Sequence, residues 1–196
     1  MTVQVSMPKD WHNASDVDPD QLWMDIRKGS KEALSRLFCV YYSHLFNYGF
    51  KVVPQQDFVK DSIQELFVIL WSQRNKIDQA YSVKSYLFHS LRRIMLRSMT
   101  RQRNRKNRNR AYAESYYEEV CNTEELMIQF ETRQEKRAWL SEAVKSLSIR
   151  QKEAVFLKVY NGMSNTEIAC IMGINQQSVY NHISKAIGKL QGCVRT

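Results

Sequence analysis

The stretch NTEIACIMGINQQSVYNHI, residues 165–183, has the residue pattern of a helix-turn-helix. Ala169 is small where two helices must cross closely, and Gly173 can adopt the positive φ that the turn between them needs. Ile174 and Val179 are placed to fill the space between the two helices. Because one spacing satisfies all these requirements together, the sequence predicts two short helices joined by a tight turn at residue 173.

The second helix of this pair is predicted to have an apolar inner stripe and a polar outer face. The inner stripe contains Val179, Ile183, Ala186, Ile187 and Leu190. Amide, hydroxyl and cationic groups on the outer face are the kinds that read base edges and phosphates in a DNA major groove. The candidate DNA contacts are Gln177, Ser178, Tyr180, Asn181, His182, Ser184 and Lys185. A helical hairpin with an ordinary polar face is the alternative, and the combined pattern favours DNA binding over it.

The rest of the chain also favours helices. Only six Gly and three Pro occur in 196 residues, and the sequence has no β-hairpin signal or internal repeat. Ser148 with Gln151, and Ser164 with Glu167, have the spacing of capping boxes, in which side chains satisfy the free N–H groups at a helix start. We therefore expect an all-α protein of two small helical domains. Its predicted parts are an N-terminal tail (1–17), a helical domain (18–110), a flexible acidic linker (111–125) and the helix-turn-helix domain (126–196).

The formal net charge of +9 comes from one segment. Residues 79–110 contain ten basic side chains and no acidic one, whereas the remainder carries 19 basic and 20 acidic residues. The basic residues are Lys84, Arg92, Arg93, Arg97, Arg101, Arg103, Arg105, Lys106, Arg108 and Arg110. Such a block is costly to hold together unless a polyanion neutralises it, and the excess of arginine favours bidentate phosphate contacts. Nucleic acid is therefore the predicted partner, ahead of acidic lipid or a merely solvated basic helix.

Simple features argue against several other classes of protein. The longest apolar run, residues 66–71, is far shorter than the roughly 18 residues of a membrane span, and the first ten residues do not resemble a secretory signal. The four cysteines are scattered, and none has a histidine at metal-ligand spacing; they are Cys39, Cys121, Cys170 and Cys193. We expect a cytoplasmic protein without a metal or cofactor.

A helix over about residues 55–73 has two apolar faces. One face should pack into the core and contains Val59, Ile63, Leu66, Phe67 and Leu70. The opposite face combines the carboxylates of Asp61 and Glu65 with the apolar side chain of Val68. From the residues alone, a partner-binding surface and a helix buried on most sides are equally good interpretations.

The order of these motifs resembles the sigma-70 family, and within it the short extracytoplasmic-function (ECF) sigma factors. DSIQELF, residues 61–67, is similar to the D-x-x-Q-E-x-F signature of the helix that docks on core RNA polymerase. The resemblance favours the partner-surface interpretation, and it implies that Asp61, Gln64, Glu65 and Val68 contact the polymerase.

Two further segments carry the resemblance. SVKSYLFHSLRR, residues 82–93, is similar to the stretch that captures and melts the minus-ten promoter element, and it implies DNA contacts by Tyr86, His89, Arg92, Arg93, Arg97 and Arg101. Many family members carry Arg-Asn where this chain has Arg92-Arg93. LSIRQKEAVFL (147–157), YNGMS (160–164) and the helix-turn-helix are similar to the region that reads the minus-thirty-five element.

The resulting prediction is a non-enzymatic promoter-specificity subunit that binds core RNA polymerase and promoter DNA. The resemblance also suggests a membrane-bound anti-sigma partner. A stand-alone helix-turn-helix regulator is the main alternative, but it would give Asp61, Gln64 and Glu65 no role. A DNA-processing enzyme is a weaker alternative, because no nucleophile with its base and no carboxylate cluster for a metal is apparent.

Overall fold

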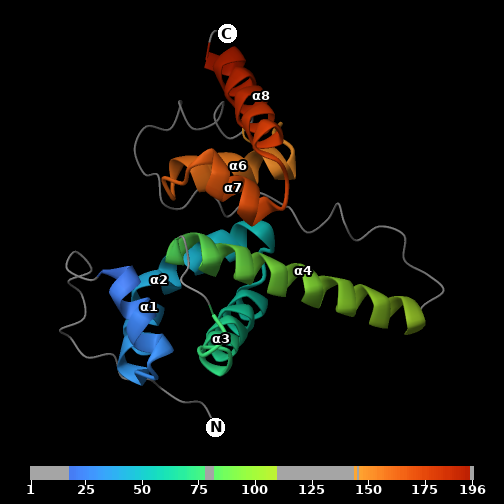
Figure 1. Ribbon diagram of the computed structural model, residues 1–196. Helices are drawn as coiled ribbons and strands as arrows, with labels where there is room; N and C mark the ends of the chain where they lie inside the picture. The colour runs from blue at the N-terminus through green and yellow to red at the C-terminus, as the bar shows by residue number, and fades with distance from the viewer. Residues whose placement is uncertain (1–17, 78–81, 110–143, 145, 195–196) are drawn as a thin grey trace.

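The computed structural model describes residues 18–77, 82–109, 144 and 146–194, and every regular element in these ranges is a helix (Figure 1). The helices are α1 (Pro19–Arg27), α2 (Lys31–Val52), α3 (Gln56–Ser72), α4 (Val83–Asn109), α6 (Ile149–Val159), α7 (Asn165–Met172) and α8 (Gln176–Val194). The all-α prediction is confirmed. The predicted tail (1–17) and linker (111–125) lie outside the described residues.

Side-chain caps mark the starts of four helices. The Asp18 side chain accepts a hydrogen bond from the Asp20 backbone N–H, and Ser30 caps α2 in the same way. Both predicted capping boxes are present, at Ser148 for α6 and at Ser164 for α7. Each box satisfies backbone N–H groups that the first turn of a helix cannot pair internally. Local sequence therefore determines where these helices begin.

Helices α1 to α4, here called the N-terminal half, surround one apolar core. Its fully buried members include Ile26, Leu37, Leu45, Ile63, Leu66, Leu87, Leu91 and Met95. Gly49 allows α2 and α3 to approach closely, since a Cβ atom at this position would lie 2.7 Å from Cγ1 of Val59. Such a contact is far shorter than van der Waals distance, so this packing needs glycine.

Helices α6, α7 and α8, the C-terminal half, form the predicted helix-turn-helix and a supporting helix. Gly173 ends α7 with φ of 65°, a left-handed conformation that favours glycine. Val179 and Ala186 of α8 are fully buried, as predicted, but Ile187 is 45% exposed. The prediction for Ile187 was wrong because this residue is turned about 100° from Ala186 around the helix, and the buried stripe does not extend that far.

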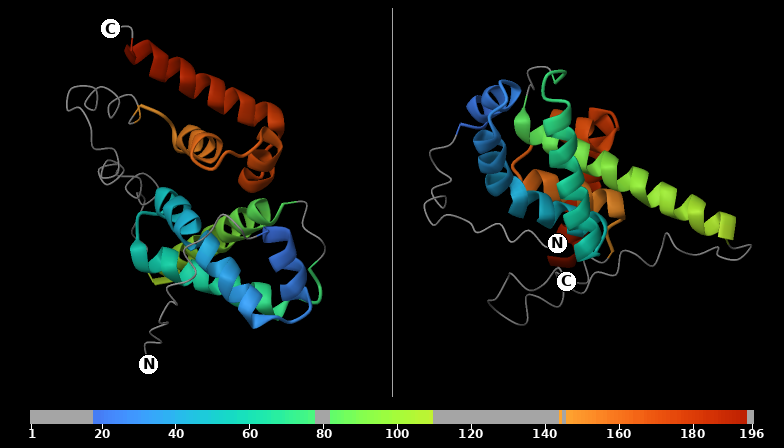
Figure 2. Two further views of the ribbon diagram at one scale, coloured as in Figure 1. Left: turned by 90° about the vertical axis from the view of Figure 1, so that its left-hand side faces the viewer. Right: turned by 90° about the horizontal axis from the view of Figure 1, so that it is seen from below.

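The two halves pack directly against each other. Helix α7 lies along the first part of α4, and α6 also reaches α2 (Figure 2). The buried apolar residues form one cluster that includes Leu87 and Leu91 on one side and Ala154, Leu157 and Met163 on the other. Within the described ranges, no helix has the length and apolarity required to cross a membrane.

Candidate nucleic-acid interface

Helix α3 has one buried face and one exposed face. Val59, Ile63, Leu66, Phe67 and Leu70 are all buried, as the sequence predicts. The predicted polymerase contacts are all exposed on the other face; they are Asp61, Gln64, Glu65 and Val68. Val68 is 67% exposed, an unusual position for a branched apolar side chain beside carboxylates. The exposed face thus combines apolar area with negative charge, a composition suited to a protein partner.

The candidate DNA contacts of α4 fall into two sets. The first set, Arg93, Arg97 and Arg101, is exposed. Their spacing of four residues places the three guanidinium groups along one side of the helix. Among the described side chains, none of the three forms an ion pair with a carboxylate. This row can therefore neutralise the phosphates of a nucleic-acid backbone.

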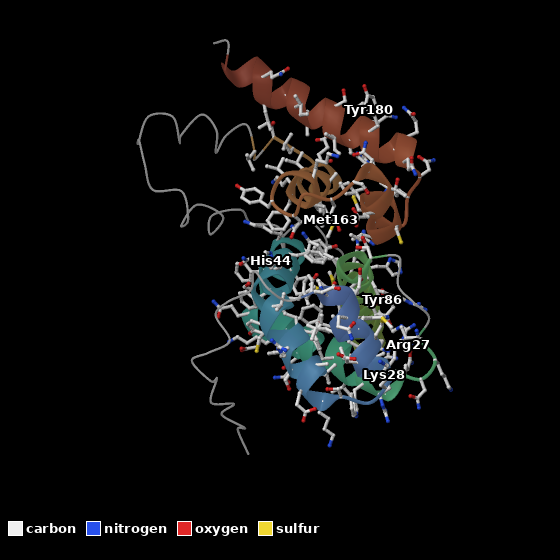
Figure 3. All side chains as sticks on the ribbon, turned by 60° about the vertical axis from the view of Figure 1, so that its left-hand side comes forward. Arg27, Lys28, His44, Tyr86, Met163 and Tyr180 are labelled. Atoms are coloured by element: carbon white, nitrogen blue, oxygen red, sulfur yellow. The ribbon has the colours of Figure 1, made fainter. Side chains whose placement is uncertain are left out.

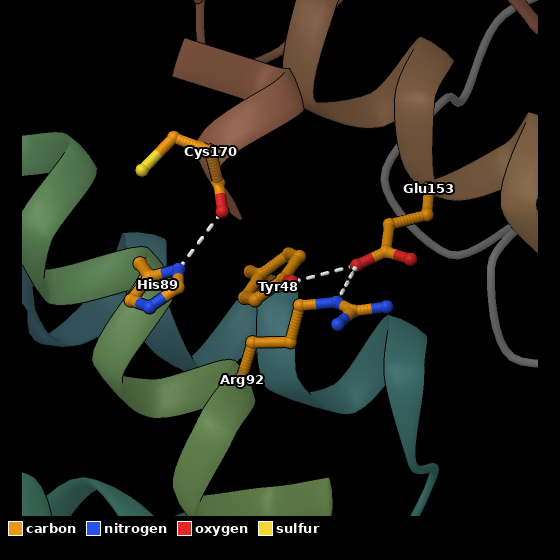
Figure 4. Close-up of polar contacts among 5 residues, drawn as sticks. All are labelled: Tyr48, His89, Arg92, Glu153 and Cys170. Carbon is orange, nitrogen blue, oxygen red and sulfur yellow. Dashed lines mark hydrogen bonds and ion pairs between the residues drawn. The ribbon is translucent and has the colours of Figure 1, made fainter. Parts of the chain in front are cut away.

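The second set, Tyr86, His89 and Arg92, contacts the protein itself. Tyr86 is half-buried and packs edge-to-face on Trp23, with ring centroids 4.9 Å apart. His89 Nδ1 lies 2.9 Å from the backbone carbonyl oxygen of Cys170. Arg92 Nε donates a hydrogen bond of 2.9 Å to Oε1 of Glu153, and the pair is a salt bridge (Figure 4). In this conformation His89 and Arg92 face the C-terminal half.

Glu153 is the centre of a buried polar network that joins three helices. The hydroxyl group of Tyr48 on α2 donates a 2.7 Å hydrogen bond to the same Oε1 atom that Arg92 of α4 approaches (Figure 4). Tyr48 is fully buried, and burial together with the negative charge of Glu153 raises the pKa of its hydroxyl well above the usual range. Tyr48 therefore remains a protonated donor, and Glu153 accepts from both α2 and α4.

The outer face of α8 is polar and open to solvent. The exposed candidate residues are Gln177, Tyr180, Asn181, Ser184 and Lys185, whereas Ser178 and His182 are half-buried. Tyr180 is 60% exposed and lies far from Tyr86 of the N-terminal half (Figure 3). Gln177 donates from Nε2 to Oδ1 of Asn181 at 3.2 Å, one turn further along the helix. The two amides are thus held on the same face of α8.

Sequence reasoning missed the polar contacts between the halves. The sequence pattern places Ser164 and Glu167 in a helix cap only, and it predicts no polar contact for Tyr48, Glu153 or Ser85. These contacts join residues that are 61 to 105 positions apart. No local sequence pattern predicts such a contact. The one hint is Glu153 itself, a charged residue at a buried position of α6. Among the described residues there is no cluster of side chains able to hold a metal ion.

Two segments of the chain match models of one protein family. Residues 37–105 match Sigma-70 region 2, and residues 137–190 match Sigma-70, region 4. The chain belongs to the sigma-70 family. Region 2 contains most of α2, all of α3 and most of α4, and region 4 contains α6, α7 and most of α8. This pairing of regions in one short chain agrees with the ECF type predicted from the sequence.

Two solved structures have a similar fold. CnrH, in complex with the cytosolic domain of CnrY, is 20% identical with a TM-score of 0.59, and the alignment covers 91% of this chain and 98% of the CnrH chain. The sigma factor RpoE from Bartonella quintana, in complex with the anti-sigma factor NepR, is 19% identical with a TM-score of 0.59, covering 84% and 98%. At these identities the likeness concerns the fold. No curated protein sequence matches the chain.

In this sigma-70 family chain, the candidate residues divide between the two matched regions. The exposed α3 residues and the α4 residues up to Arg101 lie in region 2, and the α8 residues lie in region 4. The sigma-70 family, whose regions 2 and 4 this chain matches, consists of non-enzymatic transcription initiation factors.

Proposed function

We propose that this protein is a cytoplasmic sigma factor that binds core RNA polymerase and directs it to promoters. The observation that carries the proposal is the exposed face of α3, where Asp61, Gln64, Glu65 and Val68 present carboxylates around an apolar side chain. A stand-alone regulator would bind its operator without polymerase and would have no use for this face. The match to region 2 supports the same choice.

Helix α8 is proposed to read the minus-thirty-five element as duplex DNA. Its exposed amides, Gln177 and Asn181, can form bidentate hydrogen bonds with adenine, and Lys185 can bind phosphate or guanine. Both amides are exposed to solvent and share one side of the helix, so both can face the same stretch of duplex. Tyr180, Ser184 and the half-buried Ser178 and His182 complete the proposed contact surface.

Helix α4 is proposed to hold the separated strand of the minus-ten element. Arg93, Arg97 and Arg101 bind phosphates, while Tyr86, His89 and Arg92 lie on the part of the helix nearest the C-terminal half. Single-stranded DNA is commonly bound by a cationic groove with aromatic side chains against the bases. Two DNA-binding regions in one chain raise the effective concentration of each at a promoter that contains both elements.

An anti-sigma factor is a further proposed partner. CnrH and RpoE, which share the fold, were each solved with a protein bound, and the partner of RpoE is named as an anti-sigma factor. Such a partner would compete with polymerase for the exposed face of α3 and with promoter DNA for the outer face of α8.

A run-off transcription assay with bacterial core RNA polymerase tests the proposal. Promoter fragments should give a discrete transcript only when the protein is added. Asp61→Asn/Glu65→Gln should reduce both the transcript and co-elution with core polymerase. Asp57→Asn, which removes a charge from the exposed start of α3, should have little effect. Tight duplex binding without any transcript or co-elution would instead establish the stand-alone regulator.

A further inference from the structure

The first residue of α8, Gln176, is tied to the start of α7. Its side-chain Nε2 donates a hydrogen bond of 3.0 Å to Oγ1 of Thr166, ten positions earlier in the chain. Both side chains are exposed to solvent, so the bond lies on the surface of the helix-turn-helix and not in its core. Gln176 is not among the DNA contacts predicted from the sequence, which begin at Gln177. The structure thus adds a polar link between the two helices of the motif.

The place of this pair suits a contact with duplex DNA. In a bound helix-turn-helix, the N-terminal residues of the second helix reach base edges, while the first helix crosses the DNA backbone. Gln176 begins the second helix, and Thr166 lies in the first turn of the first helix. The neighbouring Glu167 carboxylate is occupied by Ser164 and by Ser85 of α4. The pair therefore extends from the base-reading end of α8 to the helix that meets the backbone.

The bond to Thr166 leaves the reading groups of Gln176 available. An amide nitrogen carries two N–H donors, so one N–H and the carbonyl oxygen Oε1 remain for DNA. A donor beside an acceptor matches adenine in the major groove, where N7 accepts and the N6 amino group donates. Guanine offers two acceptors on this edge, so the glutamine oxygen would face another oxygen. The chemistry of Gln176 therefore selects adenine.

The hydroxyl group of Thr166 can connect this reading to a phosphate. A hydroxyl has one donor and two acceptor lone pairs, so Thr166 can accept from Gln176 and donate to a phosphate oxygen at the same time. Because an ionised phosphate only accepts, a Thr166 hydroxyl that donates to it must accept from the glutamine. This arrangement orients the amide with Nε2 toward Thr166 and leaves Oε1 for the base.

A second braced amide stands next to the first. Gln177 is held by Asn181, one turn further along α8, whereas Gln176 is held by Thr166 from α7. A side chain that is already held loses less conformational entropy when DNA binds. The start of α8 is thus pre-organised for hydrogen bonds with base edges.

We infer that Gln176 is a specificity-determining residue that selects adenine in the duplex read by α8, and that Thr166 is a positioning residue that links Gln176 to a DNA phosphate. The inference rests on the proposed role of α8 as the helix that reads the upstream element. It adds one base contact at the start of α8 and gives this contact a base preference. Because the phosphate contact orients the amide, the base and phosphate contacts support each other.

DNA binding by the holoenzyme, reconstituted from the full-length protein and bacterial core RNA polymerase, tests the inference. Promoter duplexes randomised over about ten base pairs, one helical turn, are selected for binding to the wild type. A selected duplex then serves as the probe in competition titrations. The wild type should prefer adenine at one position by about tenfold, as expected for one bidentate pair. Replacing this adenine by 7-deazaadenine, which lacks the N7 acceptor, should weaken binding by the wild type but not by Gln176→Ala.

Variants at the two positions should give distinct results. Gln176→Ala should abolish the preference for adenine at this position and leave the other positions unchanged. Gln176→Glu presents only acceptors, so it should shift the preference toward cytosine, whose N4 amino group donates. Thr166→Val keeps the size of the side chain without the hydroxyl and should reduce the preference about threefold, whereas Thr166→Ser should retain it. Gln191→Ala removes an exposed glutamine near the other end of α8 and should change nothing at this position.

An unchanged preference for adenine in Gln176→Ala, or a loss of affinity that is equal for all sequences, would overturn the assignment of Gln176. A Thr166→Val variant that keeps the full preference would overturn the positioning role of Thr166. The 7-deazaadenine probe tests the base contact on the wild type, so the result does not depend on the folding of any variant. A wild type that selects no sequence and gives no transcript contradicts the proposed function, whereas sequence selection that ignores Gln176 contradicts only the inference.

Discussion

Loss of Arg92 should destabilise the protein more than loss of Glu153, although both substitutions break the same salt bridge. Arg92→Ala leaves the Glu153 carboxylate, whose side chain is only 8% exposed, without a counter-charge, and such losses cost about 3–5 kcal/mol. Glu153→Ala removes the salt-bridge partner of Arg92, whose side chain is 20% exposed and therefore closer to water, and it leaves the Tyr48 hydroxyl without its acceptor. This loss should lower the free energy of unfolding by about 1–3 kcal/mol.

The double variant provides the sharpest comparison. Arg92→Ala/Glu153→Ala removes the buried charge altogether, so its free energy of unfolding should lie above that of Arg92→Ala alone. Urea unfolding followed by circular dichroism measures all three, with Arg97→Ala as an exposed arginine control expected within about 0.5 kcal/mol of wild type. If the two single losses simply add in the double variant, the argument from a buried unpaired carboxylate is wrong.

Further predictions concern other sites. Gly49→Ala should destabilise the fold by about 1–3 kcal/mol in thermal unfolding, because its Cβ would collide with Val59, and Val59→Ala should restore part of the loss. The folded protein lowers the pKa of the Glu167 carboxyl, so ionised Glu167 stabilises the native state when the pH is above the ordinary glutamate pKa of about 4.3. The difference in the free energy of unfolding between wild type and Glu167→Gln, measured by urea titration, should therefore shrink as the pH falls below about 4.3. Lys185→Ala should weaken binding to minus-thirty-five duplexes in anisotropy assays, with an unrelated duplex as control. Arg97→Ala should weaken all DNA about equally and lower the salt dependence; a change of sequence preference without a change of affinity would contradict this assignment.

Local chemistry explains how much of the fold could be predicted. The caps at Ser148 and Ser164 and the turn at Gly173 depend on neighbouring residues, and the structure has all three as expected. The buried face of α3 also follows from periodicity. Ile187 was placed wrongly because periodicity gives the direction of a stripe and not the width that neighbouring helices cover.

The candidate site was harder to predict for a related reason. Sequence identifies polar side chains that can bind DNA, but it does not say what contacts them within the folded chain. The family resemblance implied that His89 and Arg92 contact promoter DNA, whereas in the structure they face Cys170 and Glu153. A contact between residues 61 positions or more apart depends on how the two halves pack, which neither spacing nor composition encodes.

The two oxygen atoms of the Glu167 carboxylate accept hydrogen bonds in two different places. Its Oε2 atom accepts from the Ser164 backbone N–H and hydroxyl at the start of α7, while its Oε1 atom accepts from Ser85 on α4. A substitution at residue 167 therefore alters the helix start and the contact between halves together, whereas a substitution at Ser85 alters the contact alone. At this particular contact, only a change on the α4 side leaves the start of α7 intact, so Ser85 is the position at which the contact can be weakened or strengthened without disturbing the helix-turn-helix.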